Sequence, residues 1–257
     1  MNYLKLFGLA AFAIGAILYL ASADDHEVVV GDQTFDLGEY SKISVNTAAD
    51  LKVNVGGDYG MNITADEKDL KNLKIYVKGQ TLVIENKQRF FNKWHGDKLT
   101  IAVDMPKLKK FTLNGASDAT ISGLHGDLFK VVVNGSGNVD FEGATDELKA
   151  EVNGSGSLKS RSYEAGESSL EINGSGEVVF AGACRTLKID INGSGDFDGK
   201  DFKCRRVEVD VVGSGDLEVY ASEAIDVDVM GSGDVVVYGN PKDVRDQSRK
   251  KNHVTVH

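Results

Sequence analysis

The 257-residue chain is poor in the residues from which many catalytic and metal centres are built. It has two cysteines and five histidines, and the histidines show neither metal-ligand nor catalytic-triad spacing. The Gly-x-Ser-x-Gly nucleophile elbow and the glycine fingerprint of dinucleotide-binding folds are both missing. Apolar residues at helical spacing are also lacking through most of the chain, which argues against a helical fold. We therefore expect no catalytic residue and no organic cofactor.

One short phrase, Asn-Gly-Ser-Gly or a close variant, recurs throughout the second half of the chain. Seven copies follow one another at spacings of 18 to 20 residues, each preceded by alternating apolar residues. A unit of this length is too short to bury its own apolar face, so the copies must stack on one another. The first residues of the seven copies are Asn114, Asn134, Asn153, Asn173, Asn192, Val212 and Met230.

The spacing of apolar residues around each copy predicts strands. Apolar side chains stand one and three positions before the first residue of the phrase, as at Val131 and Val133, and return five positions after it. A period of two indicates a strand with one buried face, and the glycines permit the positive φ of tight corners. We expect an all-β, right-handed parallel β-helix, or solenoid, of about seven short rungs, with variable loops such as 142–147 and 161–167. A β-rich N-terminal region precedes it.

The first residues of the chain have the features of a signal peptide. Lys5 precedes an apolar run over residues 6–20, and Ala-Ser-Ala stands before Asp24. We expect export through the Sec pathway to the periplasm, the outer cell surface or the medium, with an uncleaved N-terminal membrane anchor as the alternative. Four segments are expected: signal peptide 1–23, β-rich N-terminal region and cap 24–106, solenoid 107–240 and basic C-terminal tail 241–257.

The ends of the solenoid need protection because open strand edges invite aggregation. The N-terminal region is expected to cover the first rung, with one helical turn at 66–72, and residues 254–256 are expected to add a last strand. The segment 89–96 holds Trp94, which either plugs the end of the core or contacts a sugar or partner. Strands of the N-terminal region are expected over 51–55, 61–64, 73–77 and 81–85.

Charge is distributed unevenly along the chain. Residues 114–240 carry 10 basic and 23 acidic side chains, whereas residues 241–257 carry 5 basic and 2 acidic ones. An acidic repeat surface argues against binding to nucleic acid or anionic lipid. The expected partner is an unknown protein or glycan at the cell envelope, and assembly into a homo-oligomer is the other possibility.

Cys184 and Cys204 are separated by about one rung. Aligned on the following strand, they occupy equivalent positions, so stacking places their Cα atoms within the range of about 4.4–6.8 Å that a disulfide requires. An oxidising compartment follows from export, so a disulfide is expected. The alternative is two reduced cysteines packed side by side.

Two outward columns of acidic residues in the last rungs are candidates for calcium binding. Stacked carboxylates about 5 Å apart repel one another, which raises some pKa values or recruits a cation, and calcium prefers oxygen ligands. The simpler interpretation is that outward positions are polar for solubility. The candidate residues are Asp190, Asp210, Asp228, Asp196, Asp216 and Asp234.

The corner Asn114-Gly-Ala-Ser117, its Asn-Gly-Ser-Gly relatives and the preceding segments Ile43-Ser-Val, 79–85 and 99–106 together resemble the putative auto-transporter adhesin, head GIN domain family. The resemblance extends over about residues 28–239. It implies a secreted or surface-exposed, strand-dominated protein with a suggested role in adhesion, and it brings no catalytic motif. No translocator segment follows, so we expect at most the head of an auto-transporter.

Three functions remain open on the sequence alone. The first is an exported, non-catalytic, adhesin-like binding or structural protein of the surface or periplasm. The second is a β-helix enzyme acting on polysaccharide, although acidic residues that recur rung after rung do not single out one catalytic pair. The third is an envelope component that assembles with copies of itself.

Overall fold

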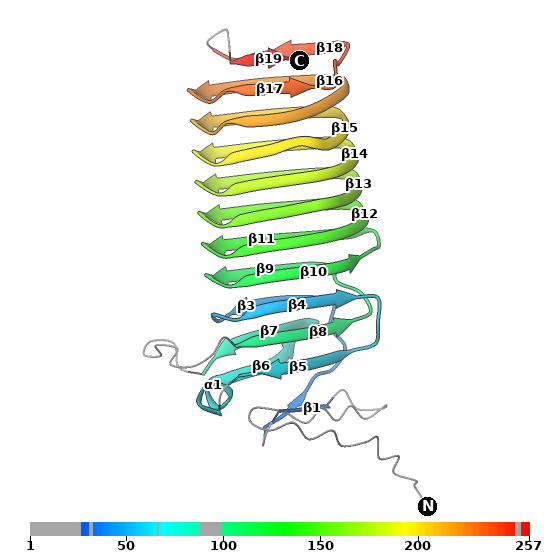
Figure 1. The fold of residues 1–257 in the computed structure, drawn as a ribbon, viewed down its shortest axis with the longest axis vertical. Coiled ribbons are helices and arrows are strands. Elements are labelled where there is room, and N and C mark those ends of the chain that lie inside the picture. Colours follow the sequence, from blue (N-terminus) through cyan, green and yellow to red (C-terminus); the bar gives the residue numbers. More distant parts are fainter. Residues whose placement is uncertain (1–26, 31–32, 66, 88–98, 250–252) are drawn as a thin grey trace, which may run out of the picture.

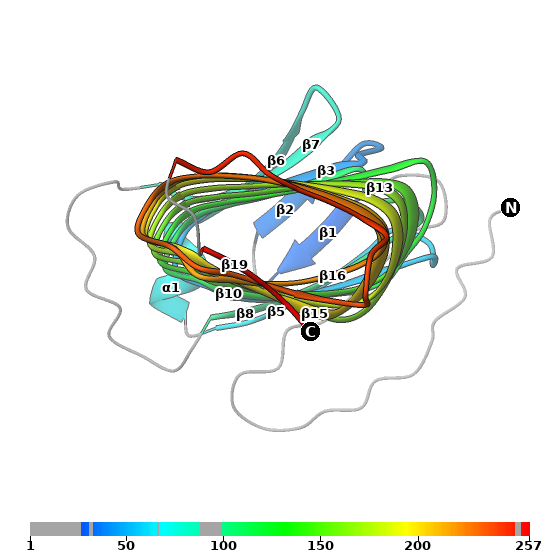
Figure 2. The same ribbon diagram turned by 90° about the horizontal axis from the view of Figure 1, so that it is seen from above.

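The chain forms a flattened solenoid of stacked strands in the computed structural model (Figure 1). Seen along its axis, each turn is an elongated oval with two broad sides (Figure 2). Equivalent residues of successive turns pair in parallel register, for example Asn153 with Asn173. The expected all-β parallel β-helix is confirmed, and about seven turns form the solenoid. The structure describes residues 27–30, 33–65, 67–87, 99–249 and 253–257, so the expected signal peptide and the Trp94 segment lie outside it.

The strands differ in length between the two halves of the molecule. In the N-terminal half each strand covers one side of the oval, whereas β12 to β16 each run from one Asn-Gly-Ser-Gly corner to the next. The elements are β1 (Glu27–Val30), β2 (Gln33–Asp36), β3 (Lys42–Asn46), β4 (Asp50–Val55), β5 (Gly60–Thr64), α1 (Glu67–Asn72), β6 (Leu73–Lys78), β7 (Thr81–Asn86), β8 (Thr100–Met105), β9 (Lys110–Gly115), β10 (Asp118–Leu124), β11 (Leu128–Gly135), β12 (Asn138–Gly154), β13 (Ser157–Gly174), β14 (Glu177–Gly193), β15 (Asp196–Gly213), β16 (Leu217–Gly231), β17 (Val235–Tyr238), β18 (Asp243–Asp246) and β19 (Val254–Val256).

We call the two broad sides the Asn face and the Asp face. The Asn face contains β3, β7, β9, β11, β18 and the second halves of β12 to β16. From β9 to β16, these segments end at an Asn-Gly-Ser-Gly corner or a close variant of it. The Asp face contains β4, β8, β10, β17, β19 and the first halves of β12 to β16. Side chains alternate between core and solvent on both faces, as the period of two predicts.

The two corners of each rung are built differently. At the Asn-Gly-Ser-Gly corner the strand is interrupted and the glycine takes a positive φ, which is 131° at Gly174. A Cβ on Gly174 would lie 2.5 Å from the carbonyl oxygen of Gly154 on the rung below, so close stacking requires glycine here. At the opposite corner the strand continues, and 142–147 and 161–167 belong to β12 and β13. The expectation of loops there was wrong, because parallel hydrogen bonds to the neighbouring rungs continue through the bend.

Aromatic rings fill the core along the continuous corner. Phe141 meets Tyr163 edge-on with ring centroids 5.2 Å apart, and Phe180 with centroids 5.6 Å apart. Such edge-to-face contacts add to the stabilisation from buried area. The Tyr163 hydroxyl is hydrogen bonded to Thr145 Oγ1 at 2.8 Å, and burial raises the pKa of Tyr163 to about 12. The interior is therefore a continuous packed core.

The rung formed by β3 and β4 is inserted between rungs that come later in the chain. β3 pairs in parallel with both β7 and β9, and β4 with both β8 and β10. Ser117 holds this rung at its corner, because its buried hydroxyl donates to the Thr47 carbonyl and accepts from the Ala49 amide. The stacked rungs therefore extend further toward the N-terminus than the sequence repeat, which begins near residue 107.

The two ends of the stack are closed to different degrees. At the N-terminal end β5 and β6 pair antiparallel with β8 and β7, and the β1–β2 hairpin lies beyond them (Figure 1). At the C-terminal end β18 and β19 form the last rung. Val244 and Val256 lie in core-facing columns of this rung, yet they are 40% and 45% exposed. Among the described residues, no helix combines the length and apolar character needed to cross a bilayer.

Candidate functional site

A ladder of asparagine side chains follows one edge of the Asn face. From Asn114 onward, each Nδ2 group donates to Oδ1 of the asparagine one rung below, at 2.9 Å from Asn153 to Asn134 and 3.0 Å from Asn173 to Asn153. The ladder satisfies partly buried amides that would otherwise lose their bonds to water. It therefore has a structural role. Its members are Asn46, Asn114, Asn134, Asn153, Asn173 and Asn192.

Apolar residues continue this column at its C-terminal end. The last link, from Asn192 to Asn173, is 3.3 Å long, and Val212 then takes the next position. Met230 follows on the rung above it. Val212 and Met230 are 47% and 44% exposed. The edge of the Asn face thus changes from amide to apolar on the rungs that contain the ends of β15 and β16.

Lys188 lies among the carboxylates of the first calcium candidate column on the Asn face. Its Nζ is 2.7 Å from Glu208 Oε1, 3.3 Å from Asp210 Oδ2 and 3.6 Å from Asp190 Oδ1. These bonds, led by the one to Glu208, raise the pKa of the Lys188 ammonium. Burial raises the pKa of Asp190, with Asp210 adding to this effect and Lys188 opposing it. The positive charge beside the carboxylates of this column is therefore supplied by Lys188.

The second calcium candidate column, on the Asp face, accepts hydrogen bonds from the main chain. Asp196 Oδ1 accepts the backbone amide of Asp216 at 2.9 Å, and Asp216 Oδ1 accepts that of Asp234 at 3.0 Å. Asp234 Oδ1 lies 3.3 Å from Nδ1 of His253. One oxygen of each aspartate is therefore used to join adjacent rungs.

The six aspartates form two separate columns. In the described part of the chain, no group of three or more His, Cys, Asp or Glu residues is arranged to hold a metal ion. Asp190, Asp210 and Asp228 occupy one column on the Asn face, while Asp196, Asp216 and Asp234 occupy another on the Asp face. The two sets lie on opposite sides of the core, so they cannot share one ion.

The arginines near the continuous corner are paired with glutamates. Arg185 lies 3.1 Å from Glu167, and Arg206 lies 3.3 Å from Glu223. All four side chains are substantially exposed, so these pairs contribute little to stability. The arrangement is that of a charged, solvated surface.

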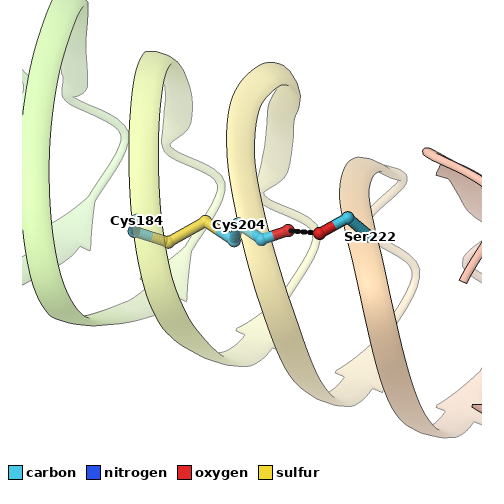
Figure 3. The surroundings of a disulfide bond; sticks show 3 residues. All are labelled: Cys184, Cys204 and Ser222. Atoms are coloured by element: carbon cyan, nitrogen blue, oxygen red, sulfur yellow. Dashed lines mark hydrogen bonds between the residues drawn. A yellow bond between two sulfur atoms is a disulfide. The ribbon is translucent and has the colours of Figure 1, made fainter.

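Cys184 and Cys204 are joined by a disulfide at the continuous corner (Figure 3). They are direct register partners on β14 and β15, with Cα atoms 4.5 Å apart. On the next rung, the Ser222 hydroxyl donates to the Cys204 carbonyl oxygen at 3.5 Å. The disulfide therefore links two turns covalently near the middle of the C-terminal half.

The Asp face carries a surface feature that the sequence reasoning missed. A shallow hollow of about 660 Å³ lies over its last rungs, lined mainly by carboxylates. Beside it, Tyr220 and Tyr238 occupy one outward column as register partners. The sequence does contain a signal for this column, because each tyrosine stands eight positions after the first residue of its repeat. The carboxylates and tyrosines are thus neighbours on the outward surface of the Asp face.

Solved bacterial proteins share this fold. A "putative lipid binding protein" from Parabacteroides distasonis is 23% identical with a TM-score of 0.76, covering 86% of this chain and 94% of that one. A "putative adhesin" from Parabacteroides merdae is 18% identical with a TM-score of 0.76, covering 85% and 91%. Another from Bacteroides fragilis is 20% identical with a TM-score of 0.62, covering 86% and 91%. At these identities the likeness establishes the fold alone.

No protein of curated function matches the chain. The family model described as "putative auto-transporter adhesin, head GIN domain" matches residues 39–241. This match includes the inserted rung, the Asn ladder, the disulfide, the two tyrosines and both aspartate columns. The chain therefore belongs to the auto-transporter adhesin head GIN domain family.

Proposed function

We propose that this protein is exported and acts as a non-catalytic, adhesin-like binding protein at the cell envelope. The observation that supports this best is the rigid pair of broad faces, whose outward columns repeat similar polar groups from rung to rung. A surface of this kind offers many equivalent contacts to a large partner, whereas catalysis requires one distinctive arrangement of groups. The disulfide between Cys184 and Cys204 fits an oxidising compartment.

The expected partner is a glycan or protein of the envelope. The net charge of −13 over residues 114–240 disfavours nucleic acid and anionic lipid, because both would be repelled by this part of the chain. One structural neighbour is described as a lipid-binding protein, so lipid vesicles belong among the ligands to be tested.

Binding of the purified protein to intact bacterial cells, to envelope fractions and to neutral and anionic vesicles tests the proposal. Saturable binding to cells or envelope fractions is the expected result. Turnover of polysaccharides by the same preparation would support the enzymatic alternative, especially if Asp210→Asn or Asp216→Asn abolished it. If the protein showed neither binding nor turnover, the proposed function would be overturned.

A further inference from the structure

We propose that the C-terminal part of the Asp face is a binding site for an uncharged glycan chain, an inference that rests on the proposed binding function. We call this surface the tyrosine–carboxylate patch. It consists of the outward side chains of the last rungs of the Asp face: Tyr220, Tyr238, Glu218, Asp216, Asp234 and Lys200.

The tyrosines form a platform that the surrounding backbone shapes. Tyr220 and Tyr238 are register partners on β16 and β17, and both are partly exposed. Gly239 leaves room for the first ring, because a Cβ there would lie 2.9 Å from Cε1 of Tyr220. The ring of His257 stacks on Tyr238, with centroids 5.7 Å apart and planes inclined by 22°. Tyr220, Tyr238 and His257 thus follow one another on successive rungs, and the last two rings stack.

The carboxylates lie directly beside this platform. Glu218 is two residues before Tyr220 on the same strand, so the two outward side chains are neighbours about 7 Å apart. Asp216 and the 70% exposed Asp234 line the far side of the hollow. Oδ1 of Asp216 accepts the Asp234 amide, while its Oδ2 has no hydrogen-bond partner among the described residues and the side chain is exposed. The patch therefore combines partly exposed aromatic rings with hydrogen-bond acceptors.

This combination matches the chemistry of a sugar. A pyranose ring presents C–H groups on its flat face, which pack on an aromatic ring, and hydroxyl groups at its edge, which donate to carboxylates. Lys200 supplies a donor for hydroxyl or ring oxygens, and it is held by Asp198 at 2.8 Å and Glu218 at 3.1 Å. An extended glycan lying along the axis would meet similar groups about every 4.8 Å, once per rung.

The charge of the patch selects among glycans. Six carboxylates and one lysine line the hollow, so uronic acids, sialic acids and sulfated sugars would be repelled. A basic peptide would be attracted to the same carboxylates, and its Arg or Lys side chains would also pack on tyrosine rings. It is therefore the competing ligand, whereas among glycans the charge of the patch favours neutral sugars.

An array of neutral and anionic oligosaccharides, followed by calorimetric titration with the strongest neutral binder, tests the proposal. We expect Tyr220→Ala and Tyr238→Ala each to weaken binding about tenfold, since aromatic anchors dominate such contacts. Tyr76→Ala is the matched control, because Tyr76 is a partly exposed tyrosine of β6 at the opposite end of the solenoid. It should bind like wild type. Glu218→Gln, which keeps the side-chain shape, should also weaken binding if the tyrosine variants prove unstable.

The outcomes separate this inference from the broader function. Glycan binding that is unchanged in the tyrosine and Glu218 variants would overturn the assignment of the site. Preference for anionic sugars or for a basic peptide would overturn the assignment of the ligand. Binding to cells without any glycan binding would overturn the inference while leaving the proposed function intact, and absence of both would overturn the two together.

Discussion

The hydroxyl groups of Tyr163 and Thr145 lie 2.8 Å apart inside the core, on adjacent rungs. Because the Thr145 hydroxyl donates to the Glu147 carbonyl oxygen at 2.8 Å, it accepts the proton of Tyr163. Ser168 is as well buried, but its Oγ has no hydrogen-bond partner among the described residues. We expect Thr145→Val to lower the free energy of unfolding by about 1–3 kcal/mol, because it leaves the Tyr163 hydroxyl unpaired. Ser168→Ala should raise it by about 1 kcal/mol, because it removes an unsatisfied group. Urea unfolding measures both free energies. A change of the same sign in the two variants would contradict the view that the Tyr163 hydroxyl is satisfied and the Ser168 hydroxyl is not.

Two substitutions can distinguish the energetic cost of a steric clash between successive corners from the cost of backbone strain at one corner. Gly115 and Gly174 have similar φ values of 124° and 131°, but only a Cβ on Gly174 would meet a neighbouring carbonyl. Gly115→Ala should cost about 1–3 kcal/mol through strain alone. Gly174→Ala should cost about 1–3 kcal/mol more, because the rungs must also move apart. Similar unfolding free energies for the two variants would show that stacking is looser than described.

Removal of the disulfide should destabilise the solenoid without changing its fold. The Cys184→Ala/Cys204→Ala double variant releases a closed loop of about 20 residues, which corresponds to about 3 kcal/mol. Urea unfolding of wild type with reductant should give a similar loss. Mass spectrometry of the exported protein under non-reducing conditions checks the bond itself, and two free thiols would rule it out.

Breaking the Asn ladder in its middle should cost more than breaking it at its end. Asn153→Ala removes the links to Asn134 and Asn173 and the 2.7 Å bond to Glu151. We expect a loss of about 1–3 kcal/mol. Asn192→Ala removes only the 3.3 Å link to Asn173, so its loss should be smaller. Thermal unfolding of both variants provides the comparison, and a larger loss at Asn192 would argue against the ladder.

Glu151 and Asp190 stand in the same outward column, two rungs apart, yet their pKa values shift in opposite directions. Hydrogen bonds from Asn153 and Lys130 lower the pKa of Glu151, whereas burial raises that of Asp190. The stability that Glu151 provides is present above its unfolded pKa and is lost as pH falls through its lower folded pKa. Ionised Asp190 instead destabilises the fold at neutral pH, and its protonation in acid relieves this.

At neutral pH we therefore expect Glu151→Gln to be less stable than wild type and Asp190→Asn to be more stable. Both differences should shrink as pH falls below about 4, where both carboxyls are largely protonated in the unfolded chain. Urea unfolding at pH 7.5 and pH 3.5 measures this. Changes of the same sign in the two variants would contradict the assigned causes.

The parts of the fold that repeat in sequence were predictable, and those that do not repeat were not. The corner phrase placed Asn134, Asn153 and Asn173 in one column because parallel strands keep equivalent residues in register. It aligned Cys184 with Cys204 for the same reason. The expected helical turn and the last strand were also found, as α1 and β19.

Other features depended on contacts that a local pattern does not encode. The insertion of β3 and β4 between later rungs rests on pairing between segments about 68 residues apart that share no corner phrase. The use of Asp196 and Asp216 as acceptors of backbone amides depends on side-chain rotamers, so the sequence showed only that the carboxylates would stack. The tyrosine column had a sequence signal, but two members are too few to stand out without the register.

The inserted position of the β3–β4 rung separates the order of synthesis from the order of assembly. Its segment leaves the ribosome early, but it gains both neighbours only after residue 124 has been made. The base of the molecule therefore depends on loop closures that are slow to form, while every later turn can be added onto a finished template. Gain or loss of whole turns during evolution should accordingly be confined to the turns that follow β10. There the length of the protein can vary without changing the pairing of the β3–β4 rung.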